Sequence, residues 1–282
     1  MPLARILREY ENLKANLNRN FDHYLDTTNT FKDLFEITYS YLQTCNRLAL
    51  DSHVPTKTYF SFQNENKFSR PVNEALYCND MPIINDFWAN LQAGSISLQS
   101  ADDITKACYT IAMSFCCAID ILNKRDQKRP GTYFEYFVGH LIAKHLNIAP
   151  TKEIPILNLD GAHMVLKTDL IFNVNNNTKF HVPVKTSTRE RAIQAWAHQR
   201  IIDGVYGAER FLGILTCIGE TKLDHRNLEV VEICLPDQWE VYQSYIAKLK
   251  RIYYLDVPIQ YRELNIVKRF GEFFHESDTL NN

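Results

Sequence analysis

Two apolar segments joined by a short polar turn constrain the fold of this chain more than any other feature. The first, residues 165–172, carries Asp169, and the second, residues 180–185, ends on Lys185. The residues between them, 173–178, are mostly asparagine, which favours a turn between two strands. The pattern predicts neighbouring strands that display an acid and a lysine close together.

An acid beside a lysine suits the hydrolysis of a phosphodiester. A carboxylate such as Asp169 can hold Mg²⁺, which lowers the pKa of bound water and usually takes only one or two protein carboxylates. A lysine such as Lys185 can orient the attacking water and offset the charge that develops on the phosphoryl group. Each residue also has an ordinary explanation, as a turn residue for Asp169 and a solvated strand-edge charge for Lys185. Together they predict a nuclease site.

The residues directly after the lysine are candidates for DNA recognition. They read Thr186-Ser187-Thr188-Arg189-Glu190-Arg191. Arginine pairs with guanine O6 and N7 through two hydrogen bonds, and glutamate accepts a hydrogen bond from cytosine N4. Arg189, Glu190 and Arg191 could therefore read two adjacent G·C pairs. The alternative is a helix N-terminus with Glu190 favourably placed at the helix dipole and two surface arginines.

This arrangement resembles the PD-(D/E)XK restriction endonucleases, and within them the group that includes SsoII, EcoRII, PspGI and NgoMIV. In that group a segment of the form Lys-x-Ser/Thr-x-Arg-Asp/Glu-Arg links the active-site lysine to the recognition of adjacent G·C pairs. Residues 185–191 match this segment at every defined position. The resemblance covers about residues 130–235, and we see none in the first 120 residues.

The resemblance implies a type II restriction endonuclease with Mg²⁺ as its cofactor. Such an enzyme cuts double-stranded DNA at a short palindrome, here one containing GG and CC, and leaves 5′-phosphate ends. It implies a homodimer, since a symmetric protein pair matches a symmetric site, and a cognate DNA methyltransferase as a functional but not a physical partner. Asp169 and Lys185 would be catalytic, and Ser187 would contact DNA together with the Arg-Glu-Arg turn.

The same resemblance supplies a further acid and reveals two departures. Enzymes of this group often carry a glutamate on an upstream helix, and Glu135 fits that place as a second metal ligand beside Asp169. The acid that normally stands two residues before the lysine is replaced by Pro183, which cannot bind metal. In this group that acid moves into the helix after the lysine, where this chain has His198 and Gln199. Either could be catalytic by holding a metal-bound water.

Hydrophobic periodicity predicts an α/β (α+β) protein with a mainly helical N-terminal region. Helical spacing extends over residues 3–17, 31–48 and 101–122, whereas residues 52–80 read as irregular. Beyond residue 130 the expected elements are a helix at 132–146, strands at 154–159, 164–173 and 179–186, a helix at 190–203, strands at 211–218 and 229–235, and a helix at 237–249.

This order agrees with the fold that the resemblance implies, a PD-(D/E)XK restriction-endonuclease-like core in which helices flank a central mixed β-sheet. Packing helices against a mixed sheet is also a stable layered solution in its own right. The expected division is a mainly helical region, 1–125, used for DNA contact or dimerisation, followed by a nuclease core, 126–282.

Charge and composition limit the possible partners. A net charge of −2 and a pI near 6.5 argue against a general polyanion binder, so any DNA contact must come from a local patch. The run 124–129 is such a patch, or else a solvated loop between regions. The N-terminus has charges inside its first turn and no uninterrupted apolar core, so it does not read as a signal peptide. The apolar run 111–122 is too short to span a bilayer, and the cysteines suit a reducing compartment. We therefore expect a cytoplasmic protein that does not bind membranes.

Two other functions stay open at this point. One is a repair or junction nuclease of the same fold that reads DNA structure instead of sequence. The other is a DNA-binding module that has lost catalysis, which would explain why Pro183 and His198 stand where acids could be expected. Trp196 and Trp239 could stack on bases, but both lie on apolar helical faces that are typical of a core.

Overall fold

A computed structural model of the protein describes residues 2–79, 81–157, 160–187, 192–219, 221–224, 226–233 and 239–280, with backbone only at 232–233. Its α-helices are α1 (Pro2–Arg19), α2 (Thr28–Leu42), α3 (Met81–Ala93), α4 (Ala101–Leu122), α5 (Lys128–Leu146), α6 (Ile193–Tyr206), α7 (Trp239–Tyr245) and α8 (Phe273–Glu276). Its strands are β1 (Asn46–Ser52), β2 (Tyr59–Asn64), β3 (Lys67–Phe68), β4 (Val72–Asn73), β5 (Thr151–Leu157), β6 (His163–Asn173), β7 (Lys179–His181), β8 (Val184–Lys185), β9 (Phe211–Cys217), β10 (Thr221–Asp224), β11 (Glu229–Ile233), β12 (Arg251–Tyr254) and β13 (Val267–Arg269).

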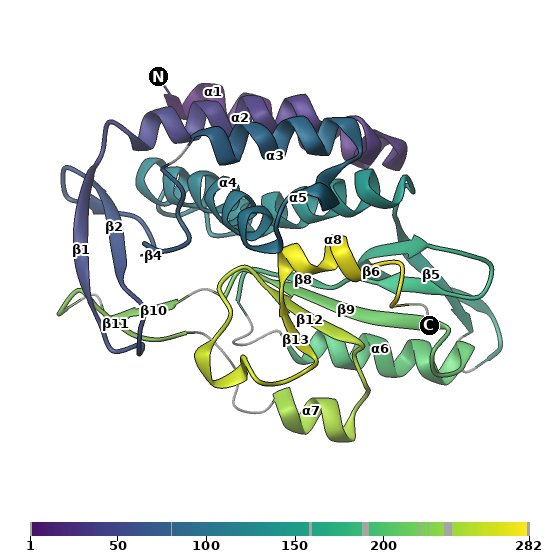
Figure 1. Ribbon diagram of the computed structural model, residues 1–282. Coiled ribbons are helices and arrows are strands. Elements are labelled where there is room, and N and C mark those ends of the chain that lie inside the picture. Colours follow the sequence, from purple (N-terminus) through teal and green to yellow (C-terminus); the bar gives the residue numbers. More distant parts are fainter. Residues whose placement is uncertain are drawn as a thin grey trace.

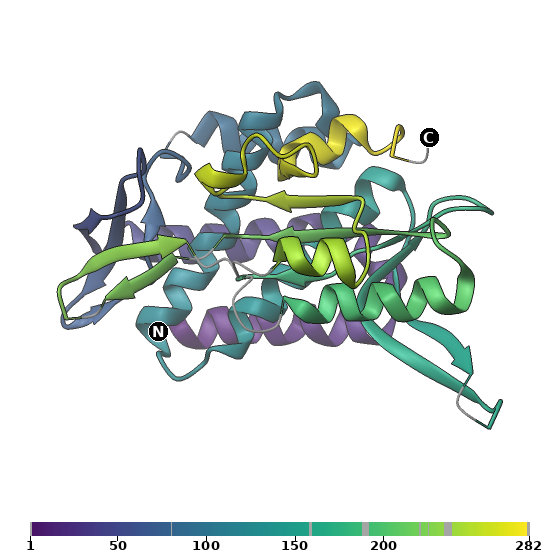
Figure 2. The same ribbon diagram turned by 90° about the horizontal axis from the view of Figure 1, so that it is seen from below.

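A mixed sheet lies at the centre of the molecule. Its strand order is β13-β12-β9-β7-β6-β5, with β8 beside β9. The pairs β5–β6 and β6–β7 are antiparallel, whereas β7, β8 and β12 each run parallel to β9. Helices α1 to α5 form a layer over one face, and α6 and α7 lie on the other (Figures 1 and 2). The expected central mixed sheet flanked by helices is confirmed.

Helix α4 forms the centre of the helical layer. It begins where the Ser100 hydroxyl accepts a hydrogen bond from the Asp103 backbone N–H, a standard N-cap. Sixteen of its 22 residues are buried. Among the residues that the structure describes, it is the one helix long and apolar enough to cross a membrane, which corrects our expectation that no stretch is long enough. Since nearly all of it is covered by the rest of the protein, it serves as a core helix.

The hydrophobic core continues across the expected boundary at residue 125. The rings of Phe115 on α4 and Tyr133 on α5 stack with centroids 3.9 Å apart. Leu170 and Phe180 from the central sheet belong to the same buried cluster as the residues of α1, α2 and α4. The division into residues 1–125 and 126–282 stays a prediction, and the core gives no break at that point.

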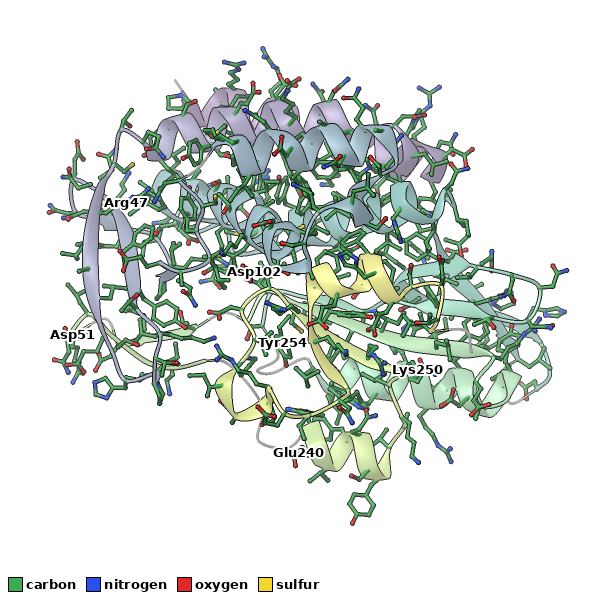
Figure 3. All side chains as sticks on the ribbon, viewed as in Figure 1. Arg47, Asp51, Asp102, Glu240, Lys250 and Tyr254 are labelled. Atoms are coloured by element: carbon green, nitrogen blue, oxygen red, sulfur yellow. The ribbon has the colours of Figure 1, made fainter. Side chains whose placement is uncertain are left out.

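A second sheet forms an arm at one end of the molecule, where Figure 3 shows Arg47 and Asp51. Its strand order is β10-β11-β1-β2-β3, with β4 beside β2. This corrects two expectations, since the helical pattern of residues 31–48 ends at Leu42 and the strand expected at 229–235 lies in the arm. The hairpin pairing of β1 with β2 and its long-range pairing with β11 override the local helical spacing near residue 46.

A buried ion pair joins the arm to the central sheet. The Lys57 ammonium contacts the Asp256 carboxylate, and both side chains are almost fully buried. Asp256 also accepts hydrogen bonds from Tyr59 and Asn73. Because every member of this group has a partner, the cluster is a structural clasp between the N-terminal and C-terminal parts of the chain.

Candidate active site

The strand that carries Asp169 is distorted at that residue. Strand β6 pairs with β5 at Ile171 opposite Thr151 and again at Lys167 opposite Glu153, so four steps along β6 match two steps along β5. Extra residues of this kind form a β-bulge, which bends a strand and redirects its side chains, often beside an active site. The bulge therefore lies over Thr168 and Asp169.

The neighbouring segment is interrupted as well. The single strand expected at 179–186 is two strands, because Pro183 has no N–H to donate and pairing stops before it. Strand β7 pairs with both β6 and β9, whereas β8 pairs with β9. The Pro183 carbonyl accepts a hydrogen bond from Thr216 N at 2.9 Å, which holds the segment on β9. The sheet is thus open between β6 and β8.

Asp169 and Lys185 meet in this opening. The Lys185 Nζ donates to Asp169 Oδ2 at 2.8 Å, and Val184 N donates to the same oxygen at 2.9 Å. The side chains are 26% and 20% exposed, so the pair is half-buried and reachable from solvent. Among the described residues, no group engages the other carboxylate oxygen, Oδ1. A shallow pocket of about 210 Å³ lies over the pair, and its lining includes Pro183 and His198.

Glu135 lies close to this pair on α5. Its carboxylate forms an ion pair with Lys152, and both side chains are about a fifth exposed. Burial raises the pKa of Glu135 above its usual value, and the nearby charge of Asp169 raises it further, while Lys152 and Lys185 act in the opposite direction. The pockets beside Glu135 and over Asp169 share Lys167 and Thr168 in their walls. Glu135 is therefore near enough to act electrostatically on the site.

The two candidates on α6 have different surroundings. His198 lines the pocket over Asp169, and burial lowers its pKa so that the imidazole is neutral at neutral pH. Gln199 is 1% exposed, and its amide bonds inward to His181, Asp203 and the Phe211 carbonyl. Of the two, His198 is in position to contact a bound water or phosphate, whereas Gln199 is committed to the interior.

Sequence reasoning missed a polar chain beneath the site. Thr168 Oγ1 lies 2.9 Å from His181 Nε2, and His181 Nδ1 lies 2.9 Å from Gln199 Oε1. His181 is fully buried, and burial lowers its pKa to about 4. The available signal was a histidine inside the apolar run 180–184, four residues before Lys185. A buried polar residue of this kind needs partners, so it indicates a hydrogen-bond network.

The proposed DNA-reading residues are mostly beyond what the structure describes. Arg189, Glu190 and Arg191 lie outside the described residues, so the Arg-Glu-Arg turn stays a prediction. Ser187 lies two residues beyond β8 and is partly exposed. Trp196 and Trp239 are buried with their rings 6.5 Å apart, which places both in the core and not on a DNA-facing surface.

A cleft of about 530 Å³ begins one residue beyond Lys185. Its lining includes Thr186, Lys124 and Lys222, which come from the end of β8, the α4–α5 turn and β10. Within the basic run 124–129, Lys124 and Arg125 are exposed, while Arg129 is held in ion pairs with Glu11 and Asp126. The run thus contributes Lys124 to a cleft beside the Asp169–Lys185 pair.

The oxygen ligands of the pocket suit a hard cation. In the parts of the chain that the structure describes, no group of three or more His, Cys, Asp or Glu side chains gathers around a common point. Mg²⁺ does not need such a cage, because it keeps several waters and takes one or two carboxylates. Asp169, whose Oδ1 has no partner among the residues that the structure describes, and Glu135 nearby fit that requirement.

Comparison with known proteins gives the fold. No family model and no curated protein sequence matches the chain. Among solved structures, the chain is similar to the Type IIP restriction endonuclease Kpn2I, with a TM-score of 0.82 and 23% identity over 100% of this chain and 98% of that one. A weaker likeness, with a TM-score of 0.40 and 14% identity, covers 72% of this chain and 92% of the restriction endonuclease PspGI in a complex with substrate DNA. The chain therefore has, over its whole length, the fold of a restriction endonuclease.

Proposed function

We propose that this protein is a type II restriction endonuclease that uses Mg²⁺ to cleave double-stranded DNA at a short palindrome. The observation that carries the proposal is the Asp169–Lys185 pair, with Nζ and Oδ2 2.8 Å apart in a pocket at an opening of the central sheet. The pair lies in a fold shared with the Type IIP restriction endonuclease Kpn2I. Fold alone does not establish function, so the chemistry of the site has to support it.

The side chains of the site can divide the reaction between them. Asp169 would hold Mg²⁺ through Oδ1, with Glu135 as the second carboxylate. A bound ion would polarise the phosphoryl oxygen and lower the pKa of water. Lys185, fixed by its bond to Asp169, presents an ammonium group that stabilises the charge developing on the phosphoryl oxygens. His198 is neutral at neutral pH and can hold a water through a ring nitrogen.

The finer parts of the proposal concern the DNA. Arg189, Glu190 and Arg191 would read GG and CC in the major groove, and Ser187 precedes them along the same segment. Lys124 in the adjacent cleft is placed to contact phosphates. Two copies would act as a homodimer on the two half-sites and leave 5′-phosphate ends. A cytoplasmic location and a partner methyltransferase that protects the host site complete the proposal.

The test is digestion of a sequenced plasmid by the purified protein with and without Mg²⁺, followed by sequencing of the ends. Discrete fragments whose ends fall in one short palindrome containing GG and CC would support the proposal. A smear, or cleavage confined to junctions and damaged sites, would indicate the structure-specific nuclease instead. Tight binding to one sequence with no cleavage at any Mg²⁺ or Mn²⁺ concentration would favour the inactive module.

A further inference from the structure

A chain of hydrogen bonds runs beneath the pocket through side chains that are largely buried. Thr168 Oγ1 and His181 Nε2 are 2.9 Å apart, and His181 Nδ1 and Gln199 Oε1 are 2.9 Å apart. Gln199 Nε2 lies 2.8 Å from both Asp203 Oδ1 and the Phe211 carbonyl oxygen. His181 is 0% and Gln199 1% exposed, so water does not compete for these bonds.

The direction of each bond follows from the last link. Asp203 Oδ1 and the Phe211 carbonyl are both acceptors, so the Gln199 nitrogen must donate to them and its oxygen must face His181. That oxygen accepts, so His181 Nδ1 carries the proton. His181 Nε2 is then unprotonated and accepts the hydrogen of the Thr168 hydroxyl. Each polar atom of the chain is matched to a partner of the opposite kind.

Thr168 itself lines the pocket, and two members of this hydrogen-bond network stand next to candidate site residues along the polypeptide. Thr168 directly precedes Asp169 on the bulge of β6, and Gln199 directly follows His198 on α6. His181 is the one side chain in the described parts of the protein that is bonded to both. His181 therefore links the β6 bulge that carries Asp169 to the helix that carries His198.

We propose that His181 is a positioning residue, which holds the β6 bulge and helix α6 together so that Asp169 and His198 face the same metal-binding pocket. This inference deepens the proposed function and rests on it for the identity of the reaction. It also assigns Gln199 a role as part of this support and not as a ligand. The hydroxyl of Thr168 is the link that reaches the strand carrying Asp169.

The protein contains a matched control for this chemistry. Thr28 Oγ1 lies 3.0 Å from His140 Nε2, and His140 Nδ1 bonds to the Tyr24 carbonyl. His140 is also fully buried, and burial lowers its pKa to about 4. This second threonine–histidine pair lies in the helical layer, between α2 and α5. Thr28→Val thus removes the same type of bond at a place that does not line the pocket.

The experiment compares Thr168→Val, Thr168→Ser and Thr28→Val with the wild type. Valine keeps the shape of threonine and removes the hydroxyl, whereas serine keeps the hydroxyl. Two readouts are required: the affinity of the DNA-free protein for Mn²⁺, from electron paramagnetic resonance of the free ion, and the single-turnover cleavage rate. Thermal midpoints of all four proteins report the structural cost.

We expect Thr168→Val to weaken Mn²⁺ binding and to slow cleavage by about 10- to 100-fold, as for other residues that orient metal ligands. Thr168→Ser should recover most of the Mn²⁺ affinity and most of the cleavage rate. Thr28→Val should leave the affinity and the rate within about 3-fold of the wild type. Its thermal midpoint should fall by about as much as that of Thr168→Val. Equal thermal losses in the two valine variants with unchanged Mn²⁺ affinity and rate in Thr168→Val would overturn the proposal.

A second arm separates this inference from the proposed function. His181→Asn places an amide nitrogen near the Nδ1 position, which keeps the bond to Gln199 and removes the acceptor for Thr168. If Thr168 and His181 act through one link, the double variant with Thr168→Val and His181→Asn should bind Mn²⁺ about as well as either single variant. Losses of Mn²⁺ affinity that add up in the double variant would count against a shared link. A wild type that binds Mn²⁺ but cleaves no DNA would refute the nuclease proposal alone, since the Mn²⁺ comparison still decides the role of His181.

Discussion

Asp169→Asn should separate the structural and chemical roles of the acid. Asp169 Oδ2 accepts both internal hydrogen bonds, from Val184 N and Lys185 Nζ. The single oxygen of asparagine can occupy the Oδ2 position and keep both bonds, while its NH₂ group replaces Oδ1, the atom that we propose for the metal. The substitution therefore removes the metal ligand and the negative charge and leaves the local geometry in place.

The size of each effect follows from this geometry. Loss of one group that stabilises the transition state costs about 10²–10³ in rate, or roughly 3–4 kcal/mol, and loss of a metal ligand should cost at least as much. The ion pair is about a quarter exposed, so weakening it should cost about 1 kcal/mol or less of folding stability. For a chain of this size that corresponds to a thermal midpoint lowered by about 2–4 °C. DNA binding without metal should be unchanged or tighter, because a negative charge near the phosphates is lost.

The assay is single-turnover cleavage of plasmid at saturating Mg²⁺, with DNA binding measured in the absence of metal and thermal unfolding followed alongside. Asp102→Asn is the control, since it removes the same charge from an ion pair of the same length, 2.8 Å to Lys106, at the start of α4 (Figure 3). A rate within 10-fold of the wild type would refute the metal-ligand role. Parallel loss of cleavage, binding and stability would mean that Asp169 is structural.

The remaining predictions address the second carboxylate, the histidine, the turn and the effect of pH. Glu135→Ala should lose more activity at limiting than at saturating Mg²⁺, whereas a purely structural glutamate would lose the same fraction at both. His198→Ala should lower the cleavage rate at least 10-fold with a thermal midpoint near that of the wild type, and an unchanged rate would leave the missing acid without a substitute on α6. Arg191→Ala should weaken binding to the cognate duplex by roughly 1–3 kcal/mol per base pair read. If Arg191 only contacts a phosphate, the substitution would instead weaken binding to cognate and scrambled duplexes equally, and the slope of log K against log salt concentration would fall by about one. Burial lowers the pKa of His140 and His181 to about 4, so these histidines take up protons in the unfolded chain before they do so in the folded protein as the pH falls below about 6.5. Each histidine should therefore lower the free energy of unfolding by up to roughly 3 kcal/mol between pH 6.5 and 4. A free energy of unfolding that stays flat over that range would contradict this.

The sequence predicted the elements whose pattern is local. The apolar runs around Asp169 and before Lys185, with asparagines between them, give an antiparallel pair, and the ladder from Ile171–His181 to Asn173–Lys179 has that form. Helix α4 was evident from the helical spacing of residues 101–122. These features depend on residues near one another along the chain, so a single sequence is enough to find them.

What the sequence did not predict depends on contacts between distant segments. The pairing of β1 with β11, about 180 residues away, leaves no local signal. The hairpin of β1 and β2 was missed because helical spacing continues to residue 48. The bulge at Thr168 is a register shift against β5 and leaves no signature in β6 itself. His198 and Gln199 also looked equivalent in the sequence. The packing of α6 on β9 distinguishes them, because it turns Gln199 inward to the Phe211 carbonyl.

Pro183, which replaces an acid of the expected motif, is compatible with an active site because of what it does to the sheet. Its lack of an N–H ends the pairing of this segment with β6, and its carbonyl keeps the chain on β9 through Thr216 N. The next N–H, that of Val184, is then available to the Asp169 carboxylate, which takes the place of a neighbouring strand. Lys185 is held by that same carboxylate, so fixing the acid and the lysine requires no side-chain acid at position 183. A second carboxylate for the metal has to come from another element, and Glu135 on α5 is a described acid whose pKa responds to the charges of Asp169 and Lys185.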